Sequence, residues 1–558
     1  MAKPPPATAP IAKILRDERM AMRDGTRLSA DIYLPQTGEQ RHPTILMRTP
    51  YGKADETEQA APLAKYLAVR GFAVVVQDVR GTGASEGVFK PYCDVEGPDG
   101  YDTLDWIVRQ DWSSGKIGTV GCSYHGEVQD MLAAERHPAH KAAFIEGAYT
   151  YNNGGMRAFS FVRYGALELA YAVGGEKDAL ETLPLARIHE RAAGPDTSYY
   201  RTRWPDAVHA WMTEPPSSPY WKDDGGLGDT ARFDVPAIHM NEWYSLPFSS
   251  IRMFELYRNN AASRLAADNQ FLILSPMTHC RTSAATEATI VGERDVGDAR
   301  IDYFGIMIDW FDHWLKGIDN GITEMPRVQA FLMGKNVWQT TDAWPPPGTE
   351  STPLYLSGDG LLGVACTPHE QRCDIVYNPT DPVPSLGGPV RAGTVLEAGA
   401  FDQREVEARD DVLVFTTHAL NTPLQVSGPI EVVLFVSSDC PDTDFTAKLV
   451  DVYPDGRAFN LVEGITRMRY RHDVTAPAPM RPGEIYRISI DLDSTSNWFG
   501  PGHRIRLEIS SSNFPRFDRN LNTGADNAAT SEYKIAHNAV HMGGNYRSRL
   551  ILPIVKGP

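Results

Sequence analysis

The chain has little cysteine. Six cysteines among 558 residues are too few for a scaffold stapled by disulfides. They show none of the Cys/His spacings that hold structural zinc. Cys366 and Cys373 are close enough in sequence to close a small loop, and the other four are isolated: Cys93, Cys122, Cys280 and Cys440. The cysteine content therefore predicts reduced or incidental thiols and no metal site.

Positive charge is also scarce. Lysine and arginine number 54 against 71 aspartates and glutamates, which gives a formal net charge of −17 at pH 7. Nucleic acids and anionic membranes are bound through basic surfaces. The charge therefore argues against both as partners, and solubility is the simplest explanation of the acidity.

Long apolar runs are absent as well. A transmembrane helix needs about eighteen or more consecutive apolar residues, and the sequence contains no such run. The first ten residues are rich in proline and alanine and lack the apolar segment of a secretory signal. The sequence therefore predicts a cytoplasmic protein, although a chain whose signal has been removed would look the same.

What is present is a globular composition, with 42% hydrophobic residues, in a chain too long for one core. In residues 1–148, strand-like runs alternate with helical ones, which is typical of a parallel α/β sheet. Residues 149–232 are dense in aromatics without strand signals and predict an inserted helical cap. The sheet pattern resumes at 233–325. In residues 326–558, many short strands between turn residues predict an antiparallel β-sandwich.

A serine between a strand and a helix is the most informative local feature. The β-prone run Ile117–Val120 leads into Ser123, and a helix-compatible run follows. A serine on such a turn is the nucleophile elbow of α/β-hydrolases, and Gly121 and Gly126 supply the small residues that the turn needs. The common elbow has glycine two residues after the serine, where this chain has His125. The motif is therefore a variant, and a glycine-rich turn without a catalytic role is the alternative.

Short motifs along nearly the whole chain resemble those of a known family. They are Met22–Gly25, Arg48–Tyr51, Gln77–Gly87, Gly121–Gly126, His313–Gly317, Ser511–Pro515 and Phe517–Asn520. In them the chain resembles the cocaine esterase and X-prolyl dipeptidyl-peptidase group of serine hydrolases. The resemblance implies an α/β-hydrolase core, a helical cap and a C-terminal jelly-roll domain, in agreement with the domain pattern above.

The resemblance also implies a nucleophile and a base. The family's serine in Gly-x-Ser-Tyr-x-Gly corresponds to Ser123. A serine hydroxyl needs a base beside it, and the family's histidine after the last core strand corresponds to His279. His239 lies within an apolar strand and fits a packed core histidine better. For His125, a structural role on the turn is the better interpretation.

Two oxyanion donors can be assigned in the same way. In α/β-hydrolases the residue after the nucleophile donates its backbone N–H, and here that residue is Tyr124. In the family, a tyrosine hydroxyl in the early Arg-x-Pro-Tyr loop is the second donor, which corresponds to Tyr51. The alternative for Tyr51 is a packing role.

The family's triad acid is missing from its place. Its aspartate lies in a Gly-Trp-Tyr-Asp segment, and this chain has Glu242-Trp243-Tyr244-Ser245 there. Glu242 is in the right loop, and a helical turn would bring positions 242 and 245 to one face. We therefore take Glu242 as the candidate acid. The alternative is that Glu242 is solvated and that Ser245 or a water orients His279.

These residues predict a serine hydrolase that acts on a carboxylic ester, less favourably an amide, with a bulky apolar acyl or alcohol group. Two alternatives stay open: acyl transfer to a small-molecule acceptor, and a non-catalytic binding protein with a degraded triad. No metal or organic cofactor is implied. The expected partner is the small-molecule substrate, and the sequence leaves the oligomeric state open, a homo-oligomer included.

Overall fold

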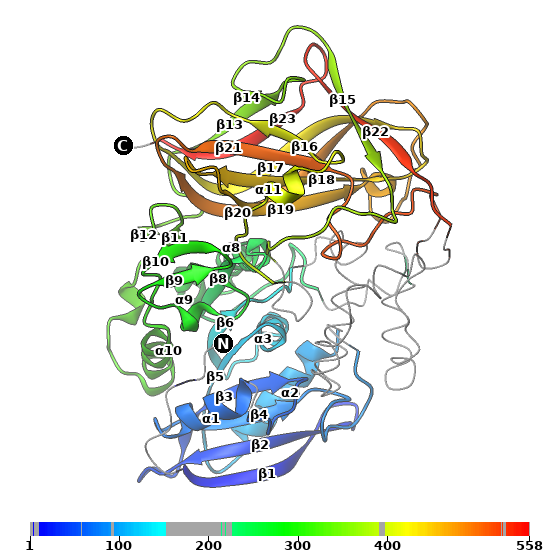
Figure 1. The fold of residues 1–558 in the computed structure, drawn as a ribbon. Helices are drawn as coiled ribbons and strands as arrows, with labels where there is room; N and C mark the ends of the chain where they lie inside the picture. The colour runs from blue at the N-terminus through cyan, green and yellow to red at the C-terminus, as the bar shows by residue number, and fades with distance from the viewer. Residues whose placement is uncertain are drawn as a thin grey trace.

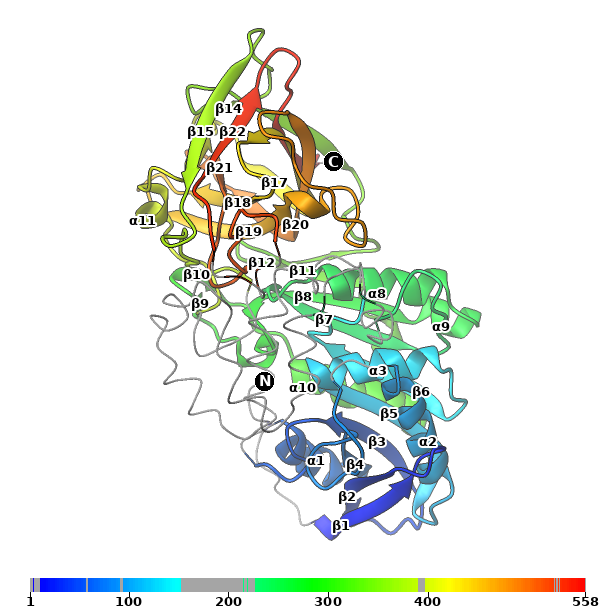
Figure 2. The ribbon, with the colours of Figure 1, turned by 90° about the vertical axis from the view of Figure 1, so that its right-hand side faces the viewer.

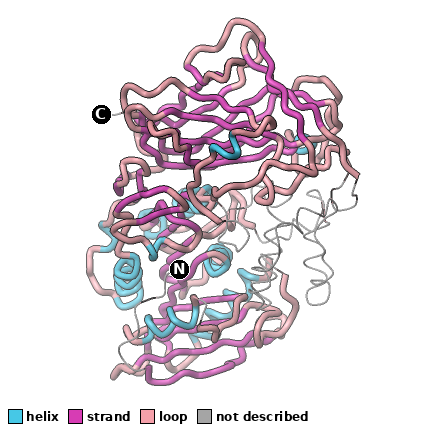
Figure 3. Tube along the Cα trace, in the orientation of Figure 1, coloured by secondary structure: helices cyan, strands magenta, loops and turns pink. Residues whose placement is uncertain are grey.

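The computed structural model of the chain describes residues 4, 11–56, 59–90, 94–151, 214, 218, 226–389, 397–525, 527, 530 and 532–556. The cap predicted at 149–232 lies almost entirely outside the described residues, and so does Cys93. Two parts are stacked, an α/β part below and a β part above (Figures 1 and 2). Strands dominate the upper part, whereas the lower part mixes strands and helices (Figure 3).

The α/β part is built on one ten-stranded sheet with the order β1-β2-β4-β3-β5-β6-β7-β8-β11-β12. Its strands are β1 (Ile11–Ala21), β2 (Arg27–Pro35), β3 (His42–Thr49), β4 (Ala73–Asp78), β5 (Ser113–Cys122), β6 (His140–Glu146), β7 (Ala237–Tyr244), β8 (Gln270–Thr278), β11 (Val328–Leu332) and β12 (Val337–Thr341). From β4 to β11 the pairings are parallel, and the antiparallel strands lie at the edges. This arrangement is the α/β sheet that the alternating pattern predicts.

Helices cover both faces of this sheet. They are α1 (Ala60–Ala68), α2 (Glu96–Val108), α3 (Tyr124–Ala134), α8 (Phe248–Asn259), α9 (Arg264–Asp268) and α10 (Tyr303–Phe311), which runs into a π-helical turn, η5 (Asp312–Lys316). The side chains of β6 alternate between the faces, as a strand requires. Phe144 packs in the cluster with α1 and α10, while Ala143 and Ile145 pack in the cluster with α3 and α8.

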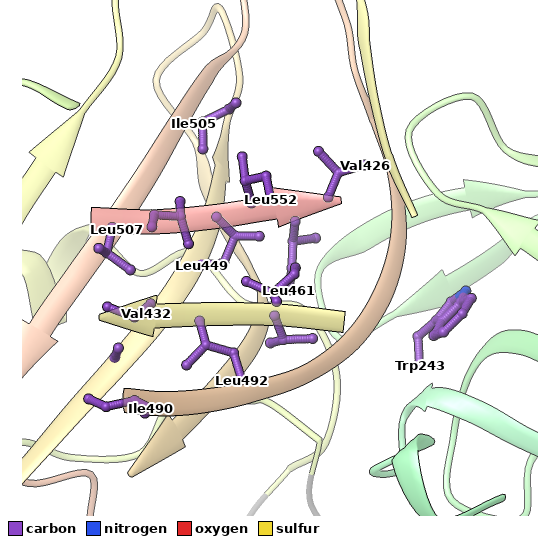
Figure 4. Packing of buried hydrophobic residues seen from close by; sticks show 14 of the residues in the cluster. Trp243, Val426, Val432, Leu449, Leu461, Ile490, Leu492, Ile505, Leu507 and Leu552 are labelled. Atoms are coloured by element: carbon purple, nitrogen blue, oxygen red, sulfur yellow. The ribbon is translucent and has the colours of Figure 1, made fainter. Parts of the chain in front are cut away.

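The β part consists of a seven-stranded and a four-stranded antiparallel sheet. The first contains β13 (Thr349–Leu356), β14 (Leu362–Gly363), β15 (Gln371–Tyr377), β17 (Leu424–Ser438), β20 (Tyr486–Phe499), β22 (Ala536–Met542) and β23 (Arg549–Val555). The second contains β16 (Leu413–Thr416), β18 (Asp444–Val452), β19 (Ala458–Arg467) and β21 (Arg504–Ser510). Side chains from both sheets meet in one apolar core, where Leu449, Leu461 and Leu507 lie near Val432 and Leu552 (Figure 4).

Smaller elements connect these layers. They are the hairpin β9 (Thr289–Val291) and β10 (Arg294–Gly297), the helix α11 (Arg404–Glu407), and the 3₁₀ turns η4 (Thr282–Ala284), η6 (Ile322–Glu324) and η7 (Met468–Tyr470). No helix in the described part of the chain combines the length and apolarity needed to span a bilayer.

The two parts share a core. One hydrophobic cluster contains Trp243 and Phe331 of the α/β part together with the sandwich residues shown in Figure 4. The Tyr244 hydroxyl donates a hydrogen bond to the carbonyl of Asn460 in β19 at 3.0 Å. The end of β7, where the family's acid would lie, is therefore held against the sandwich.

The α/β sheet extends further along the chain than the sequence predicts. The pattern places the start of the sandwich at residue 326, yet β11 pairs with β8 and β12 pairs with β11 in the ten-stranded sheet. The first sandwich strand is β13, which begins at Thr349. The sequence pattern of a short strand is the same in either sheet, because it does not identify the strand with which it pairs.

Candidate active site

Ser123 has the strained backbone of a nucleophile elbow. It lies between β5 and α3 with φ 64° and ψ −129°. Residues other than glycine rarely adopt a positive φ of this size. Its N–H donates to the carbonyl of Glu146 at 2.9 Å, which ties the turn to the end of β6. A Cβ on Gly121 would lie 2.3 Å from the Cβ of His125, and one on Gly126 would lie 2.8 Å from the Glu146 carbonyl oxygen. Neither position has room for a side chain, so both require glycine.

His125 is buried beneath this turn. It is 1% exposed, and its ring meets that of Tyr51 edge-on at 5.5 Å between centroids. Burial lowers its pKa to about 4, so that the ring is neutral near pH 7. The structural role expected from the sequence is consistent with this position, which also brings Tyr51 next to the first turn of α3.

The two predicted oxyanion donors come from neighbouring elements. Tyr51 follows β3, which pairs in parallel with β5, the strand that ends before Ser123. Tyr124 is the first residue of α3, and the first N–H groups of a helix have no acceptor within the helix. The Tyr124 hydroxyl donates to Glu96 at 2.6 Å, so the predicted oxyanion role concerns only the backbone N–H of this residue and stays a prediction.

The carboxyl ends of four adjacent parallel strands bring the other site residues together. In sheet order, β5 ends before Ser123, β6 ends at Glu146, β7 ends before Ser245, and β8 ends before His279. Ligand and catalytic sites of α/β sheets form at this edge. Residues far apart in sequence therefore meet in one place.

His279 is 7% exposed, and the structure gives its Nδ1 two close oxygen atoms. The Oγ of Ser245 is 2.8 Å from Nδ1, and the hydroxyl of Tyr149 is 3.2 Å from it. Tyr149 also donates to the carbonyl oxygen of Ser245 at 2.5 Å. The place of the family's aspartate is thus occupied by a serine that reaches the histidine, supported by a tyrosine that the sequence does not single out.

Glu242 lies behind this pair, fully buried. Its Oε1 accepts a hydrogen bond from the Thr282 hydroxyl at 2.9 Å. Burial, and next the charge of Glu146, raise the pKa of Glu242 well above its usual range, while the hydrogen bond from Thr282 opposes the rise. Glu242 is therefore not a solvated side chain. The hydrogen bond of its carboxyl group goes to Thr282 and not to His279, and its catalytic role stays a prediction.

A disulfide joins the segments of the two candidate catalytic residues, Ser123 and His279. Cys122, immediately before Ser123, is bonded to Cys280, immediately after His279. The expectation of isolated thiols is wrong for this pair, because β5 and β8 end at the same edge of the sheet although 158 residues separate the two cysteines. Cys366, Cys373 and Cys440 are free thiols.

Among the described residues, one group of metal-ligand types gathers here: Cys122, Cys280 and His279, with donor atoms within 4.8 Å of one another. Cysteine binds metals as the thiolate. Since the two sulfurs are bonded to each other, this group offers a metal only an imidazole. His239, by contrast, is a packed core residue, 1% exposed, with its Nε2 3.1 Å from the Oε1 of Gln270.

Two family models match the chain. The model of the X-Pro dipeptidyl-peptidase (S15 family) matches residues 24–281, and that of the X-Pro dipeptidyl-peptidase C-terminal non-catalytic domain matches residues 320–551. Together they cover most of the α/β part and most of the sandwich, and they leave out β1 and the segment that contains α10.

Individual relatives extend over the whole chain. The cocaine esterase of Rhodococcus sp. (strain MB1 Bresler) is 35% identical, with 96% of this chain and 97% of that protein covered. Among solved structures, an aminopeptidase from the marine sediment archaeon Thaumarchaeota archaeon aligns with a TM-score of 0.82 at 25% identity over 100% of this chain and 99% of that chain. An α-amino acid ester hydrolase aligns with a TM-score of 0.75 at 26% identity over 99% and 98% of the two chains. The chain belongs to the serine hydrolase family that comprises the X-Pro dipeptidyl-peptidases and cocaine esterase, and it has that family's α/β-hydrolase core and C-terminal β domain.

Proposed function

We propose that this protein hydrolyses a carboxylic ester through an acyl-enzyme on Ser123. The observation that carries the proposal is the strained turn at Ser123, which a disulfide couples to the segment of His279. Backbone strain of this kind persists where function requires it. The esterase names of the relatives support an ester as the substrate.

The proposed reaction follows from the residue types. The Oγ of Ser123 attacks the ester carbonyl carbon while Nε2 of His279 takes its proton. The Tyr51 hydroxyl and the Tyr124 N–H donate to the oxyanion of the tetrahedral intermediate. Collapse breaks the bond to the alcohol, which leaves with the proton from His279. Water then repeats the sequence and releases the acid.

For the substrate we propose a bulky, largely apolar acyl or alcohol group, based on the aromatic residues of the 149–232 segment. We also propose that this segment forms a helical cap and that the sandwich has a jelly-roll topology. One observation favours amides as a second substrate class, namely the similarity to an aminopeptidase. A comparison of kcat/KM for an ester and for an anilide of the same acyl group would show which of the two substrate classes is preferred.

The test is covalent labelling. A fluorophosphonate should modify the wild-type protein at Ser123, as peptide mass spectrometry would show. Ser123→Ala should not be labelled, and its turnover of p-nitrophenyl or aryl esters should be several orders of magnitude below that of the wild type. Turnover retained by Ser123→Ala would remove the covalent mechanism. A wild-type protein that is neither labelled nor active would instead favour the non-catalytic alternative.

A further inference from the structure

Three side chains meet just beyond the ends of three adjacent strands. Tyr149 follows β6, Ser245 follows β7 and His279 follows β8, and these strands are neighbours in the sheet. Ser245 is fully buried, and Tyr149 and His279 are each 7% exposed. The rings of Tyr149 and His279 are stacked, with 5.5 Å between their centroids and 26° between their planes. The hydroxyls of Ser245 and Tyr149 both lie at the Nδ1 edge of the imidazole, at 2.8 Å and 3.2 Å.

The proton of the Tyr149 hydroxyl has a definite acceptor. This hydroxyl is 2.5 Å from the carbonyl oxygen of Ser245, and a carbonyl oxygen only accepts hydrogen bonds. A phenol has one proton, so Tyr149 donates it to the carbonyl. The phenol oxygen therefore acts as an acceptor at its other two contacts, with Oγ of Ser245 at 2.9 Å and with Nδ1 of His279.

The Ser245 hydroxyl must supply the next proton. Its Oγ is 2.9 Å from the Tyr149 oxygen, a hydrogen-bond distance that requires a proton between the two atoms. Since the phenol proton is on the carbonyl, the serine proton fills this place. Oγ of Ser245 then offers lone pairs to Nδ1 of His279, 2.8 Å away, so Nδ1 carries a proton. A neutral imidazole has one N–H, and Nε2 is therefore the nitrogen that can take a proton.

We propose that Tyr149 and Ser245 hold His279 in the tautomer that a general base requires, through a chain of hydrogen bonds from Nδ1 to the Ser245 carbonyl. Both are positioning residues, since they act through the histidine. The inference rests on the proposed function because it concerns the base of that reaction. In a serine triad, a carboxylate sets this tautomer by accepting from Nδ1. Here the acceptor is a hydroxyl, which can also donate, so the tyrosine has to set its direction.

The same arrangement serves both protonation states of the base. When Nε2 takes the proton of Ser123, Nδ1 keeps its own proton and continues to donate to Ser245. The Ser245 proton stays with Tyr149, and the Tyr149 proton stays with the carbonyl. No hydroxyl has to turn during the reaction, which is the condition for a preorganised site.

Tyr149→Phe is the first test. The variant keeps the stacked ring and removes the acceptor of the Ser245 proton. That proton is then free to turn to Nδ1, which moves the imidazole proton to Nε2 and removes the base. We expect kcat to fall roughly 10- to 10³-fold with little change in KM, short of the about 10⁴-fold loss that a complete change of tautomer causes elsewhere. Tyr244→Phe is the matched control, because it also removes a buried hydroxyl that donates to a backbone carbonyl, and it should leave kcat unchanged.

Ser245→Ala is the second test. It should cost less than Tyr149→Phe, although Oγ of Ser245 is the atom nearer to Nδ1. In the alanine variant the Tyr149 oxygen, 3.2 Å from Nδ1, can still accept from it. We expect about a tenfold loss of kcat, the order of one hydrogen bond between neutral groups. A larger loss in Ser245→Ala than in Tyr149→Phe overturns the chain.

A third variant replaces the chain by a carboxylate. Ser245→Asp added to Tyr149→Phe should recover most of the lost activity, because an ionised carboxylate only accepts and needs no tyrosine to direct it. A variant damaged only in packing would not recover in this way. A double variant that is no more active than Tyr149→Phe overturns the chain.

The tautomer of His279 is a direct readout. In protein labelled with ¹⁵N-histidine, at a pH where the imidazole is neutral, the ring shifts distinguish a proton on Nδ1 from one on Nε2, and His279→Gln assigns these resonances by their loss. The wild type should carry the proton on Nδ1, and Tyr149→Phe should move it partly or wholly to Nε2. A wild type with the proton on Nε2 overturns the chain, and this measurement decides if Tyr149→Phe does not fold.

Fluorophosphonate labelling of Ser123 separates the failure of this inference from the failure of the proposed function. If the wild type is labelled and Tyr149→Phe has the same kcat as Tyr244→Phe, the chain is overturned and the proposed function stays intact. A wild type that is not labelled overturns both, because His279 is then not the base of an acyl transfer.

Discussion

Gly147 marks the point where the site has no room for a side chain. Its backbone is left-handed, with φ 58°, and a Cβ there would lie 2.9 Å from Sγ of Cys122 and 3.0 Å from Cε1 of His279. Such a Cβ must push the imidazole or the disulfide. A misplacement of about 1 Å in a catalytic group costs roughly 10²-fold in rate.

Gly147→Ala should therefore lower kcat by about 10- to 100-fold. Gly115→Ala is the matched control, because Gly115 has a similar φ of 78° but nothing within 4 Å of its Cβ. Both variants should lose about 1 kcal/mol of unfolding free energy from the left-handed backbone. Steady-state kinetics and urea denaturation separate the two effects, and equal kcat in both variants would contradict the crowding argument.

Tyr51 is expected to act only in the transition state. Tyr51→Phe keeps the ring that meets His125 and removes the hydroxyl. Loss of one oxyanion donor should lower kcat about 10²- to 10³-fold with little change in KM. Steady-state kinetics on an aryl ester would measure it, and an effect on KM alone would place Tyr51 in substrate binding instead.

The sequence predicts those site residues that depend on local pattern. Ser123 and His279 each follow an apolar strand in a recognisable motif, and the structure places both at the same edge of the sheet. Tyr149, whose hydroxyl lies 3.2 Å from Nδ1 of His279, is not found this way. Its position beside His279 depends on which strands are neighbours in the sheet, and the sequence does not identify them.

At the scale of elements, the bond between Cys122 and Cys280 connects the ends of β5 and β8 across two intervening strands. Its prediction from sequence fails because pairing depends on sheet order. By the chain-entropy account, a cross-link that closes a loop of this length contributes about 5 kcal/mol by restricting the unfolded chain. It also limits how far Ser123 and His279 can separate, since each is adjacent to one of the two cysteines.

Replacing both cysteines with alanine should lower the melting temperature and reduce kcat, with KM affected less. The same double replacement at Cys366 and Cys373, which are free thiols, is the control and should change neither. Mass spectrometry of alkylated but unreduced protein should recover the Cys122 and Cys280 peptides linked. Recovery of both peptides alkylated would show that the bond does not form.

At the scale of the whole molecule, the α/β part and the sandwich are joined by polar as well as apolar contacts. Arg294 of β10 is 1% exposed and forms an ion pair with Asp451 of β18 at 3.2 Å. It also donates to the Asn497 side chain of β20 at 2.8 Å. The apolar cluster that contains Trp243 is continuous across the same boundary. The two parts are therefore expected to unfold together, although domain patterns in the sequence suggest separable units.

Arg294→Met should destabilise this joint, because it leaves the carboxylate of Asp451 buried with one partner fewer. Removing one member of a buried ion pair costs about 3–5 kcal/mol. Arg457→Met is the control, since the ion pair of Arg457 with Asp455 is about half exposed and should be worth under about 1 kcal/mol. Asp451→Asn added to Arg294→Met should recover part of the loss, because it removes the buried negative charge that Arg294 balanced. Urea unfolding followed by tryptophan fluorescence and by ester turnover should give one coincident transition in wild type, shifted to lower urea in Arg294→Met. Two separate transitions in wild type would mean that the shared core does not couple the two parts.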